Sequence, residues 1–84
     1  METTKPKSIR LFVKPWCGWC SQAEEWLKAR GIAYEKLNVF MHPSAYREMR
    51  DLSGQDLAPV IDVDGQILAD FDTAQLAEFW KRFE

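Results

Sequence analysis

The only two cysteines of the chain, Cys17 and Cys20, lie three residues apart in the stretch KPWCGWC. If a helix begins at the first cysteine, side chains at i and i+3 share a face, and the two sulfur atoms come within disulfide-bonding distance. Unpaired backbone N–H groups and the positive end of the helix dipole then stabilise a thiolate at Cys17. Such a position lowers the pKa of a cysteine to about 3.5 to 7.5, from about 8.5 in a free thiol. The spacing therefore predicts thiol–disulfide exchange.

The two cysteines are expected to play different parts in this exchange. Cys17, at the helix start, attacks a disulfide, whereas Cys20, one turn inside and on the apolar side, is less accessible and resolves the mixed disulfide. Lys14, three residues before Cys17, either places a positive charge near the sulfur or an anionic substrate, or is a solvated lysine at a strand end. The sequence alone favours neither interpretation of Lys14.

Two other uses of a close cysteine pair are a zinc site and a structural disulfide. A zinc site needs about four ligands, and His42 is the only histidine, so the ligand set is incomplete and no metal is expected. The N-terminal stretch METTKPK lacks the apolar core of a signal peptide, and the apolar runs are too short to span a bilayer. We therefore expect a cytoplasmic protein without a membrane partner, where reducing systems keep thiol pairs from serving as structural disulfides.

Composition and charge indicate one globular domain. The chain has 84 residues, of which 46% are hydrophobic and 29% charged, and it shows no low-complexity tract or internal repeat. With a net charge of -2 and no cluster of five or more basic residues, it lacks the positively charged surface typical of nucleic-acid-binding proteins. We expect a flexible tail over residues 1–7, one domain over residues 8–84, and a monomer.

The pattern of apolar residues predicts seven elements in the order βαβαββα. Gly31 and Gly54 end the first two helices, Asp64 and Gly65 form the turn of a two-residue hairpin, and Asp72 is the N-cap of the last helix. The expected strands cover 8–14, 32–39, 60–63 and 66–69; the expected helices cover 18–30, 41–54 and a segment after Asp72 that buries Leu76, Phe79, Trp80 and Phe83.

A four-stranded mixed sheet follows from this order of elements. Because a strand–helix–strand unit crosses over right-handed, the first two strands lie parallel, and the hairpin adds antiparallel strands to the same sheet. Helices then cover both faces, the second one with a side that contains Tyr46, Met49 and Leu52. The predicted fold class is α/β, and the cysteine motif lies where the first helix begins.

Three stretches of the sequence resemble the glutaredoxin family, the small redox branch of the thioredoxin-fold superfamily. KPWCGWC is similar to the lysine, proline and CxxC block of that family, LSGQDLAPVI to its serine–glycine stretch before a valine–proline step, and VDGQILADFD to its turn, strand and aspartate block. The resemblance runs from about Ser8 to the C-terminus. It implies a thioredoxin-like fold and a thiol–disulfide oxidoreductase whose catalytic residues are Cys17 and Cys20.

The resemblance also implies a binding site around the cysteine pair. The Ala58–Pro59 peptide bond is expected to be cis and to lie opposite Cys17, so that the backbone of Ala58 pairs with a substrate cysteine as an added strand residue does. Glutathione, as electron donor, and disulfide-containing proteins are the expected partners. By position, the glutathione groove of the family corresponds to Lys14, Trp19, Ala58 and Asp72, with Phe71 beside Asp72.

The sequence departs from the family pattern at three places. Gly18-Trp19 stands for the usual proline and tyrosine between the cysteines, Leu57-Ala58 for threonine–valine before the proline, and Ala69-Asp70 for a pair of glycines. Asp70 would bring a negative charge near an anionic ligand. Two alternatives to a glutathione-dependent oxidoreductase therefore stay open. One is a glutaredoxin-like redoxin recharged by thioredoxin reductase, and the other is a carrier in which two chains and two glutathiones hold a [2Fe-2S] cluster through Cys17.

Overall fold

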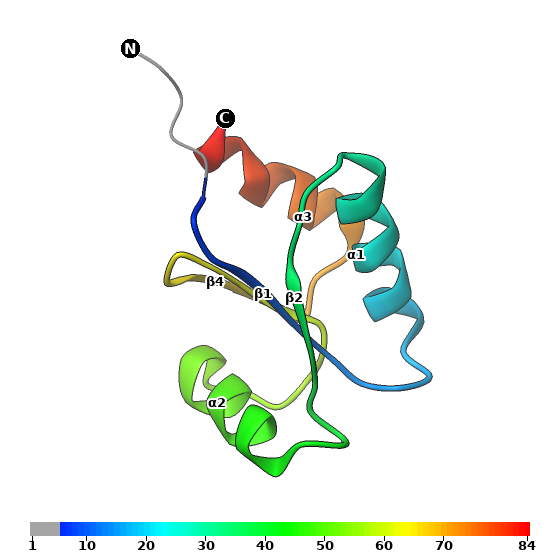
Figure 1. The fold of residues 1–84 in the computed structure, drawn as a ribbon, viewed down its shortest axis with the longest axis vertical. Helices are drawn as coiled ribbons and strands as arrows, with labels where there is room; N and C mark the ends of the chain where they lie inside the picture. The colour runs from blue at the N-terminus through cyan, green and yellow to red at the C-terminus, as the bar shows by residue number, and fades with distance from the viewer. Residues whose placement is uncertain (1–5) are drawn as a thin grey trace.

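The computed structural model of the chain describes residues 6–84, so residues 1–5 of the predicted tail lie outside it. Four strands form one sheet in the order β2-β1-β3-β4, with helices on both faces (Figure 1). The predicted order of elements and the α/β class are confirmed. The elements are β1 (Ile9–Val13), α1 (Gly18–Ala29), β2 (Glu35–Asn38), α2 (Pro43–Ser53), β3 (Val60–Val63), β4 (Gln66–Ala69), α3 (Thr73–Trp80) and a final 3₁₀ turn (Lys81–Phe83).

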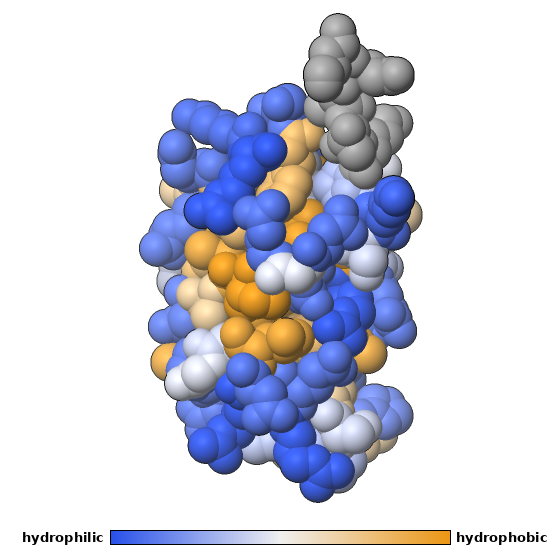
Figure 2. Space-filling model, turned by 90° about the vertical axis from the view of Figure 1, so that its left-hand side faces the viewer, coloured by the Kyte–Doolittle hydropathy of each residue, from blue (hydrophilic) through white to orange (hydrophobic). Residues whose placement is uncertain are grey.

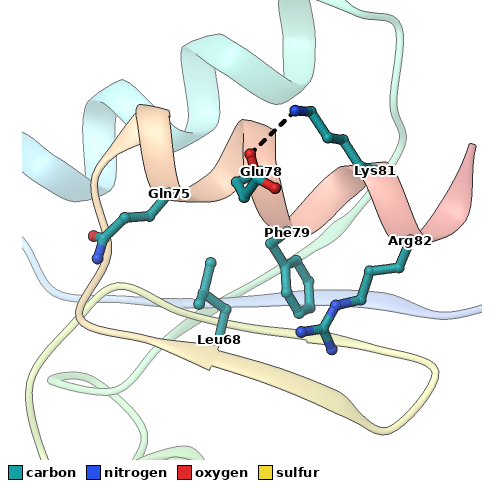
Figure 3. Close-up of a pocket in the computed structure, with 6 residues that line it drawn as sticks. All are labelled: Leu68, Gln75, Glu78, Phe79, Lys81 and Arg82. Atoms are coloured by element: carbon teal, nitrogen blue, oxygen red, sulfur yellow. Dashed lines mark hydrogen bonds and ion pairs between the residues drawn. The ribbon is translucent and has the colours of Figure 1, made fainter.

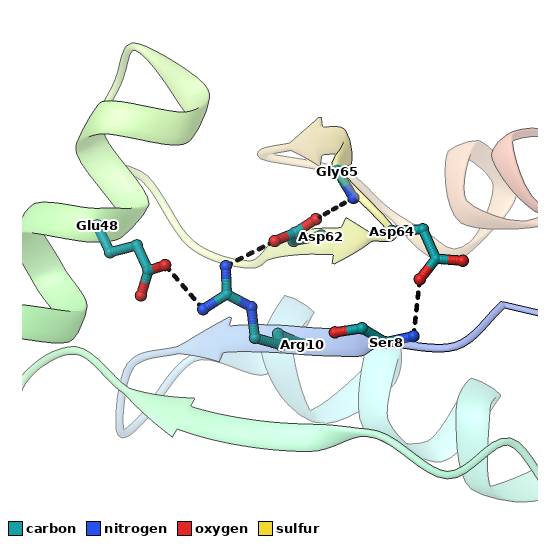
Figure 4. A network of polar contacts seen from close by, with 6 residues as sticks. All are labelled: Ser8, Arg10, Glu48, Asp62, Asp64 and Gly65. Carbon is teal, nitrogen blue, oxygen red and sulfur yellow. Dashed lines mark hydrogen bonds and ion pairs between the residues drawn. The ribbon is translucent and has the colours of Figure 1, made fainter.

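The strand pairings follow the predicted topology. β1 lies parallel to β2 and antiparallel to β3, and β3 pairs antiparallel with β4. Asp64 and Gly65 form the β3–β4 turn with φ angles of 51° and 90°, the left-handed conformation that a two-residue hairpin turn needs. The Asp64 carboxylate also accepts a hydrogen bond of 2.7 Å from the backbone N–H of Ser8, which fixes the turn beside the start of β1 (Figure 4).

Side chains that alternate along the strands build one apolar core on each face of the sheet. Leu11 and Val13 of β1 face α1 and α3, whereas Phe12 between them faces α2. Each helix closes one of these cores with its buried side. The core under α1 and α3 includes Cys20, Ala23, Leu27, Leu76, Phe79 and Trp80, and the core under α2 includes Val39, Ala45, Met49 and Val60.

The second strand is shorter than predicted, because the end of α1 holds the residues before it. The backbone N–H of Gly31 donates to the carbonyl of Lys28 at 3.0 Å, and the N–H of Ile32 donates to that of Leu27 at 3.0 Å. With Gly31 at a φ of 69°, these two bonds form a Schellman motif. Ile32 is therefore tied to the helix end, and the strand begins only at Glu35.

The side of α2 that faces the sheet becomes more exposed toward the end of the helix. Ala45 and Met49 are buried and Tyr46 is half-buried, but Leu52 is 38% exposed. Leu52 follows Ala45 by seven residues and Met49 by three, so it lies on the same side of the helix, but it is the penultimate residue of α2. The side predicted to contain Tyr46, Met49 and Leu52 is thus buried at Met49 and reaches the surface at Leu52, near the end of the helix.

A polar network connects β1, β3 and α2 (Figure 4). The Arg10 guanidinium donates to Asp62 Oδ2 at 2.6 Å and to Glu48 Oε2 at 2.8 Å. Asp62 is the one buried charged side chain in the described part of the chain, and its other oxygen accepts from the Gly65 N–H at 2.8 Å. The hydrogen bond with Asp62 raises the pKa of Arg10 above its ordinary value. The guanidinium therefore stays charged and compensates the buried carboxylate.

The edge of the sheet at β4 is partly apolar on its surface. Ile67, Leu68 and Ala69 are half-buried. Figure 2 shows the side of the molecule on which β4 lies, and an apolar area there is bordered by polar side chains. Within residues 6–84, no helix is long and apolar enough to cross a membrane.

One end of the sheet brings together the loops that carry the predicted site residues. Because β2 runs parallel to β1 and β3 antiparallel to it, the ends of β1, β2 and β4 and the start of β3 lie at the same end. The N–H of Val39 donates to the carbonyl of Val13 at 3.0 Å, and that of Asp70 donates to the carbonyl of Pro59 at 2.9 Å. Four separate parts of the chain are thus held side by side.

Candidate active site

Cys17 and Cys20 are joined by a disulfide bond at the start of α1. Their Cα atoms lie 5.2 Å apart. Cys17 is the N-cap residue of the helix, and its Sγ accepts a hydrogen bond of 3.1 Å from the backbone N–H of Cys20. This N–H is one of the four donors that the first helical turn leaves without a partner. A thiolate at Cys17 would therefore find a hydrogen-bond donor and the positive end of the helix dipole beside it.

The two sulfur atoms differ in accessibility. Cys17 is half-buried, whereas Cys20 is only 2% exposed and belongs to the core under α1 and α3. A substrate that arrives from solvent therefore meets Cys17 first. The arrangement suits an exchange in which Cys17 attacks and Cys20 resolves the mixed disulfide from the protein side.

The segment before β3 lies opposite Cys17. The Ala58–Pro59 peptide bond is cis, and the carbonyl oxygen of Ala58 is 4.0 Å from Cys17 Sγ. Pro59 itself is buried, while Ala58 is half-buried. The structure thus brings Ala58, Pro59 and Cys17 together, with a partly accessible backbone segment beside the sulfur atom.

Lys14, at the end of β1, reaches toward the loop before Pro59. Its Nζ donates to the backbone carbonyl of Asp56 at 2.8 Å, and the hydroxyl of Tyr46 donates to Asp56 Oδ2 at 3.3 Å. Lys14 also lines a cavity of about 440 Å³ on the α2 side of the site, together with Val39, Phe40, Pro43 and Tyr46.

Trp19 and Phe71 line a second cavity, of about 230 Å³, on the α3 side of the site, and Asp70, Asp72 and Gln75 complete its wall. Asp72 is the N-cap of α3: its carboxylate accepts from the N–H of Gln75 at 2.8 Å, and the Gln75 side chain accepts from the N–H of Asp72 at 2.9 Å. The reciprocal pair is a capping box. Two of the backbone donors near this helix start are therefore already occupied.

Two residues of the site adopt a left-handed backbone conformation, which residues other than glycine seldom adopt. Trp16 has a φ of 57° and Asp70 a φ of 51°. This conformation costs about 1–2 kcal/mol for a bulky residue such as Trp16, whereas aspartate adopts it more readily. Trp16 is 93% exposed, so burial of its ring does not offset this cost. Its ring meets that of Phe40 edge to face, with centroids 6.3 Å apart.

Three residues of the site were not predicted from the sequence: Phe40, Asp56 and Gln75. Gln75 could have been found, because it follows Asp72 at the spacing of a capping box. Phe40 belongs to no motif, and Asp56, although it lies in LSGQDLAPVI, is not a position to which the resemblance assigns a role. Their contacts with Trp16 and Lys14 join distant parts of the chain. These two contacts can be recognised only after the strands have been placed in register.

Another cavity, of about 540 Å³, lies between β4 and α3 (Figure 3). Its wall contains Leu68 and Phe79, and its charged side chains already have partners: Lys81 pairs with Glu78 at 3.1 Å, and the Arg82 guanidinium lies over the Phe79 ring at 4.9 Å. None of its lining residues belongs to the cysteine motif or to the segment before β3. Within residues 6–84, no three His, Cys, Asp or Glu side chains gather as metal ligands.

Sequence comparison relates this chain to known redox proteins. The sequence model of the Glutaredoxin family matches residues 9–68, a span that includes Lys14, both cysteines and Pro59 but ends before Asp70. A protein of Clostridium pasteurianum, described as an uncharacterized glutaredoxin-like 8.6 kDa protein in the rubredoxin operon, is 37% identical over 68 residues. These residues cover 81% of this chain and 91% of that protein.

Comparison with solved structures finds similar redox proteins as well. The crystal structure of the thioredoxin-like protein BC3987 has 30% sequence identity and a TM-score of 0.69, and the match covers 84% of this chain and 97% of that chain. The crystal structure of a glutaredoxin from Archaeoglobus fulgidus has a TM-score of 0.76 at 17% identity, with 84% of this chain and 83% of that chain covered. This second likeness concerns the thioredoxin-like fold alone.

Proposed function

The chain belongs to the glutaredoxin family of thiol–disulfide oxidoreductases, and we propose that it reduces protein disulfides and glutathione mixed disulfides with glutathione as the electron donor. The observation that carries the proposal is the position of Cys17, which is accessible at the N-terminus of α1 and lies 4.0 Å from the carbonyl of Ala58. We also propose the cytoplasm as its compartment, because a reducing environment keeps such a pair in the dithiol form.

The reaction is a two-step exchange that moves two electrons. The Cys17 thiolate attacks one sulfur of the substrate disulfide, so a bond forms between Cys17 and that sulfur while the other substrate sulfur leaves as a thiolate. The Cys20 thiolate then attacks Cys17 Sγ, which forms the Cys17–Cys20 disulfide and releases the second substrate thiolate. Two molecules of glutathione return the pair to the dithiol form and become one glutathione disulfide.

The proposed binding of glutathione uses both sides of Cys17. On one side, the Lys14 ammonium has three N–H donors, of which one bonds to Asp56, so it can also bind a carboxylate of glutathione. On the other side, Trp19 supplies an aromatic wall and Asp72 a carboxylate, which suits the α-amino group. The backbone of Ala58 would pair with the cysteine residue between these two ends.

A second candidate donor, a thioredoxin reductase, is favoured by Asp70. Asp70 lines the same cavity as Asp72 and Trp19, so a bound anionic tripeptide would meet two negatively charged residues there. The capping box also occupies the N–H of Asp72 and the N–H of Gln75, which are then not available to a carboxylate of glutathione. A reductase that docks on the protein surface would not need this cavity.

A coupled assay separates the two donors. NADPH oxidation is followed with insulin as disulfide substrate, in parallel reactions that contain either glutathione with glutathione reductase or thioredoxin reductase alone. We expect turnover that depends on this chain in the glutathione reaction. Turnover with thioredoxin reductase alone would show that the second candidate, and not glutathione, is the electron donor. If neither reaction turns over and the protein reduced beforehand also fails to reduce insulin, the oxidoreductase activity on protein disulfides is contradicted.

Removal of the charge at Asp70 is predicted to improve the use of glutathione mixed disulfides. A unit charge about 4 Å from an anionic ligand costs about 1 kcal/mol in water, so Asp70→Asn should lower the KM for a glutathionylated peptide about fivefold. Asp70→Gly should lower it at least as much, because glycine also adopts the positive φ of this position without strain. The measurement is KM at low and high salt, and the gain should shrink as salt screens the charge.

The matched control for this prediction is Asp51→Asn, which removes an exposed aspartate from the end of α2. It changes the net charge of the protein by the same amount and should leave the KM unchanged. If Asp51→Asn lowers the KM as much as Asp70→Asn does, the effect belongs to the overall charge and not to the cavity.

A further inference from the structure

The exposed apolar surface of the protein is concentrated around the cysteine pair. Among residues 6–84, six large apolar side chains are exposed, and all but Leu52 belong to the start of α1 or to the loops at the active-site end of the sheet. Trp16 and Trp19 flank Cys17, Phe40 and Met41 follow β2, and Leu57 precedes the Ala58–Pro59 bond.

Trp16 and Phe40 form the outer part of this surface on the α2 side. They are 93% and 69% exposed, and their rings contact each other edge to face. Trp16 directly precedes Cys17, and it holds a left-handed backbone conformation with its ring in solvent. Packing within this chain gives no reason for such a ring position, since the ring covers neither core.

A cavity of about 440 Å³ adjoins the aromatic pair. This volume lies within the range of about 300 to 1,000 Å³ that ligand pockets occupy. Val39, Phe40 and Pro43 give it apolar walls, and its two polar lining residues, Lys14 and Tyr46, both direct a hydrogen bond to Asp56. The cavity therefore offers mainly apolar contact.

We propose that Trp16, Phe40 and this cavity form a subsite that binds an apolar side chain of the protein substrate, close in sequence to its reacting cysteine. The inference rests on the proposed function, because the mixed disulfide with Cys17 must hold a substrate chain beside this surface. The subsite is continuous with that covalent contact, since Trp16 is the neighbour of Cys17 and Lys14 lines the cavity. It selects extended protein segments with an aliphatic or aromatic residue next to the cysteine.

The test uses the reduced protein in single turnovers, so that no electron donor enters the result. The substrates are hydroxyethyl disulfide and a set of short peptides whose cysteine forms a mixed disulfide with 2-mercaptoethanol. In this set, the residue directly before the cysteine and the residue directly after it are varied one at a time, each as Phe or as Asn. We expect that at one position Phe raises the rate constant about 10-fold over Asn, as one well-placed aromatic anchor does.

Variants then locate the preference. Phe40→Ala and Trp16→Ala should each remove most of the preference for Phe over Asn. Each peptide rate is divided by the hydroxyethyl disulfide rate of the same variant, so that a general loss of activity does not enter the comparison. Leu52→Ala is the matched control, since it truncates an exposed apolar side chain that does not line the cavity and should keep the preference. Phe40→Ala decides the outcome if Trp16→Ala is poorly folded.

The possible outcomes separate this inference from the proposed function. Reduction of hydroxyethyl disulfide with no preference at any peptide position, or a preference that survives in Phe40→Ala, would overturn the subsite alone. Failure of the wild-type protein to reduce hydroxyethyl disulfide would overturn the proposed function itself. A dimer in solution that dissociates in Phe40→Ala, without a peptide preference, would assign the surface to a second copy of the chain and overturn the proposal.

Discussion

Cys17→Ser should abolish the reduction of both protein disulfides and glutathione mixed disulfides. The hydroxyl of serine is a far weaker nucleophile than a thiolate, and it cannot form a disulfide, so we expect a loss of at least about a thousandfold in kcat/KM. The NADPH-coupled assay with insulin and with a glutathionylated peptide measures both activities. Serine is the suitable replacement, because its oxygen can accept the Cys20 N–H that Cys17 Sγ accepts now and thus keep the N-cap of α1.

A control shows whether this loss is chemical. Thermal unfolding of Cys17→Ser should be compared with that of the reduced wild-type protein, since both lack the disulfide. Similar stability with lost activity supports the role of Cys17 as nucleophile. Substantial activity in a folded Cys17→Ser protein would mean that Cys20 attacks substrates, despite its 2% exposure.

Cys20→Ser should separate the two activities. A glutathione mixed disulfide can be reduced through Cys17 alone, because a second glutathione resolves the intermediate, so this activity should stay within a few-fold of wild type. A protein disulfide leaves the substrate bound to Cys17, and without Cys20 its release becomes slow. We expect the reduction of insulin to fall at least about a hundredfold. The attack of Cys20 on the mixed disulfide is intramolecular and has a high effective molarity, which an external thiol does not reach.

Burial complicates the choice of residue at position 20. Cys20 lies in the core under α1 and α3, where the serine hydroxyl would need a hydrogen-bond partner. Cys20→Ala removes the thiol without adding a polar group and serves as the matched variant. Equal loss of both activities in the two variants would contradict the separate roles of the cysteines.

Local patterns were sufficient to predict most of the fold. The CxxC spacing, Gly31, the Asp64-Gly65 turn and the Asp72 cap each act over a few residues, and the structure contains all of these features. The error concerns a boundary. Ile32 was assigned to a strand because the Schellman closure of α1 is not visible in an alternation of apolar residues.

The walls of the active site were less predictable than its centre. The cysteine pair and Pro59 belong to motifs, but the partner of Lys14 is the carbonyl of Asp56, 42 residues away. The contact of Trp16 with Phe40 likewise depends on the parallel pairing of β1 with β2. Such contacts follow from the register of the sheet, which no single stretch of sequence contains.

The central claim, that Cys17 attacks and Cys20 resolves, is tested most directly by trapping the mixed disulfide. Reduced Cys20→Ser and Cys17→Ser proteins are each mixed with excess glutathione disulfide, quenched with acid at set times and analysed by mass spectrometry. The account predicts rapid formation of one glutathione adduct in Cys20→Ser, and formation at least about a hundredfold slower in Cys17→Ser, because Cys20 is buried and Cys17 lies at the helix N-terminus. Faster adduct formation in Cys17→Ser than in Cys20→Ser would contradict it.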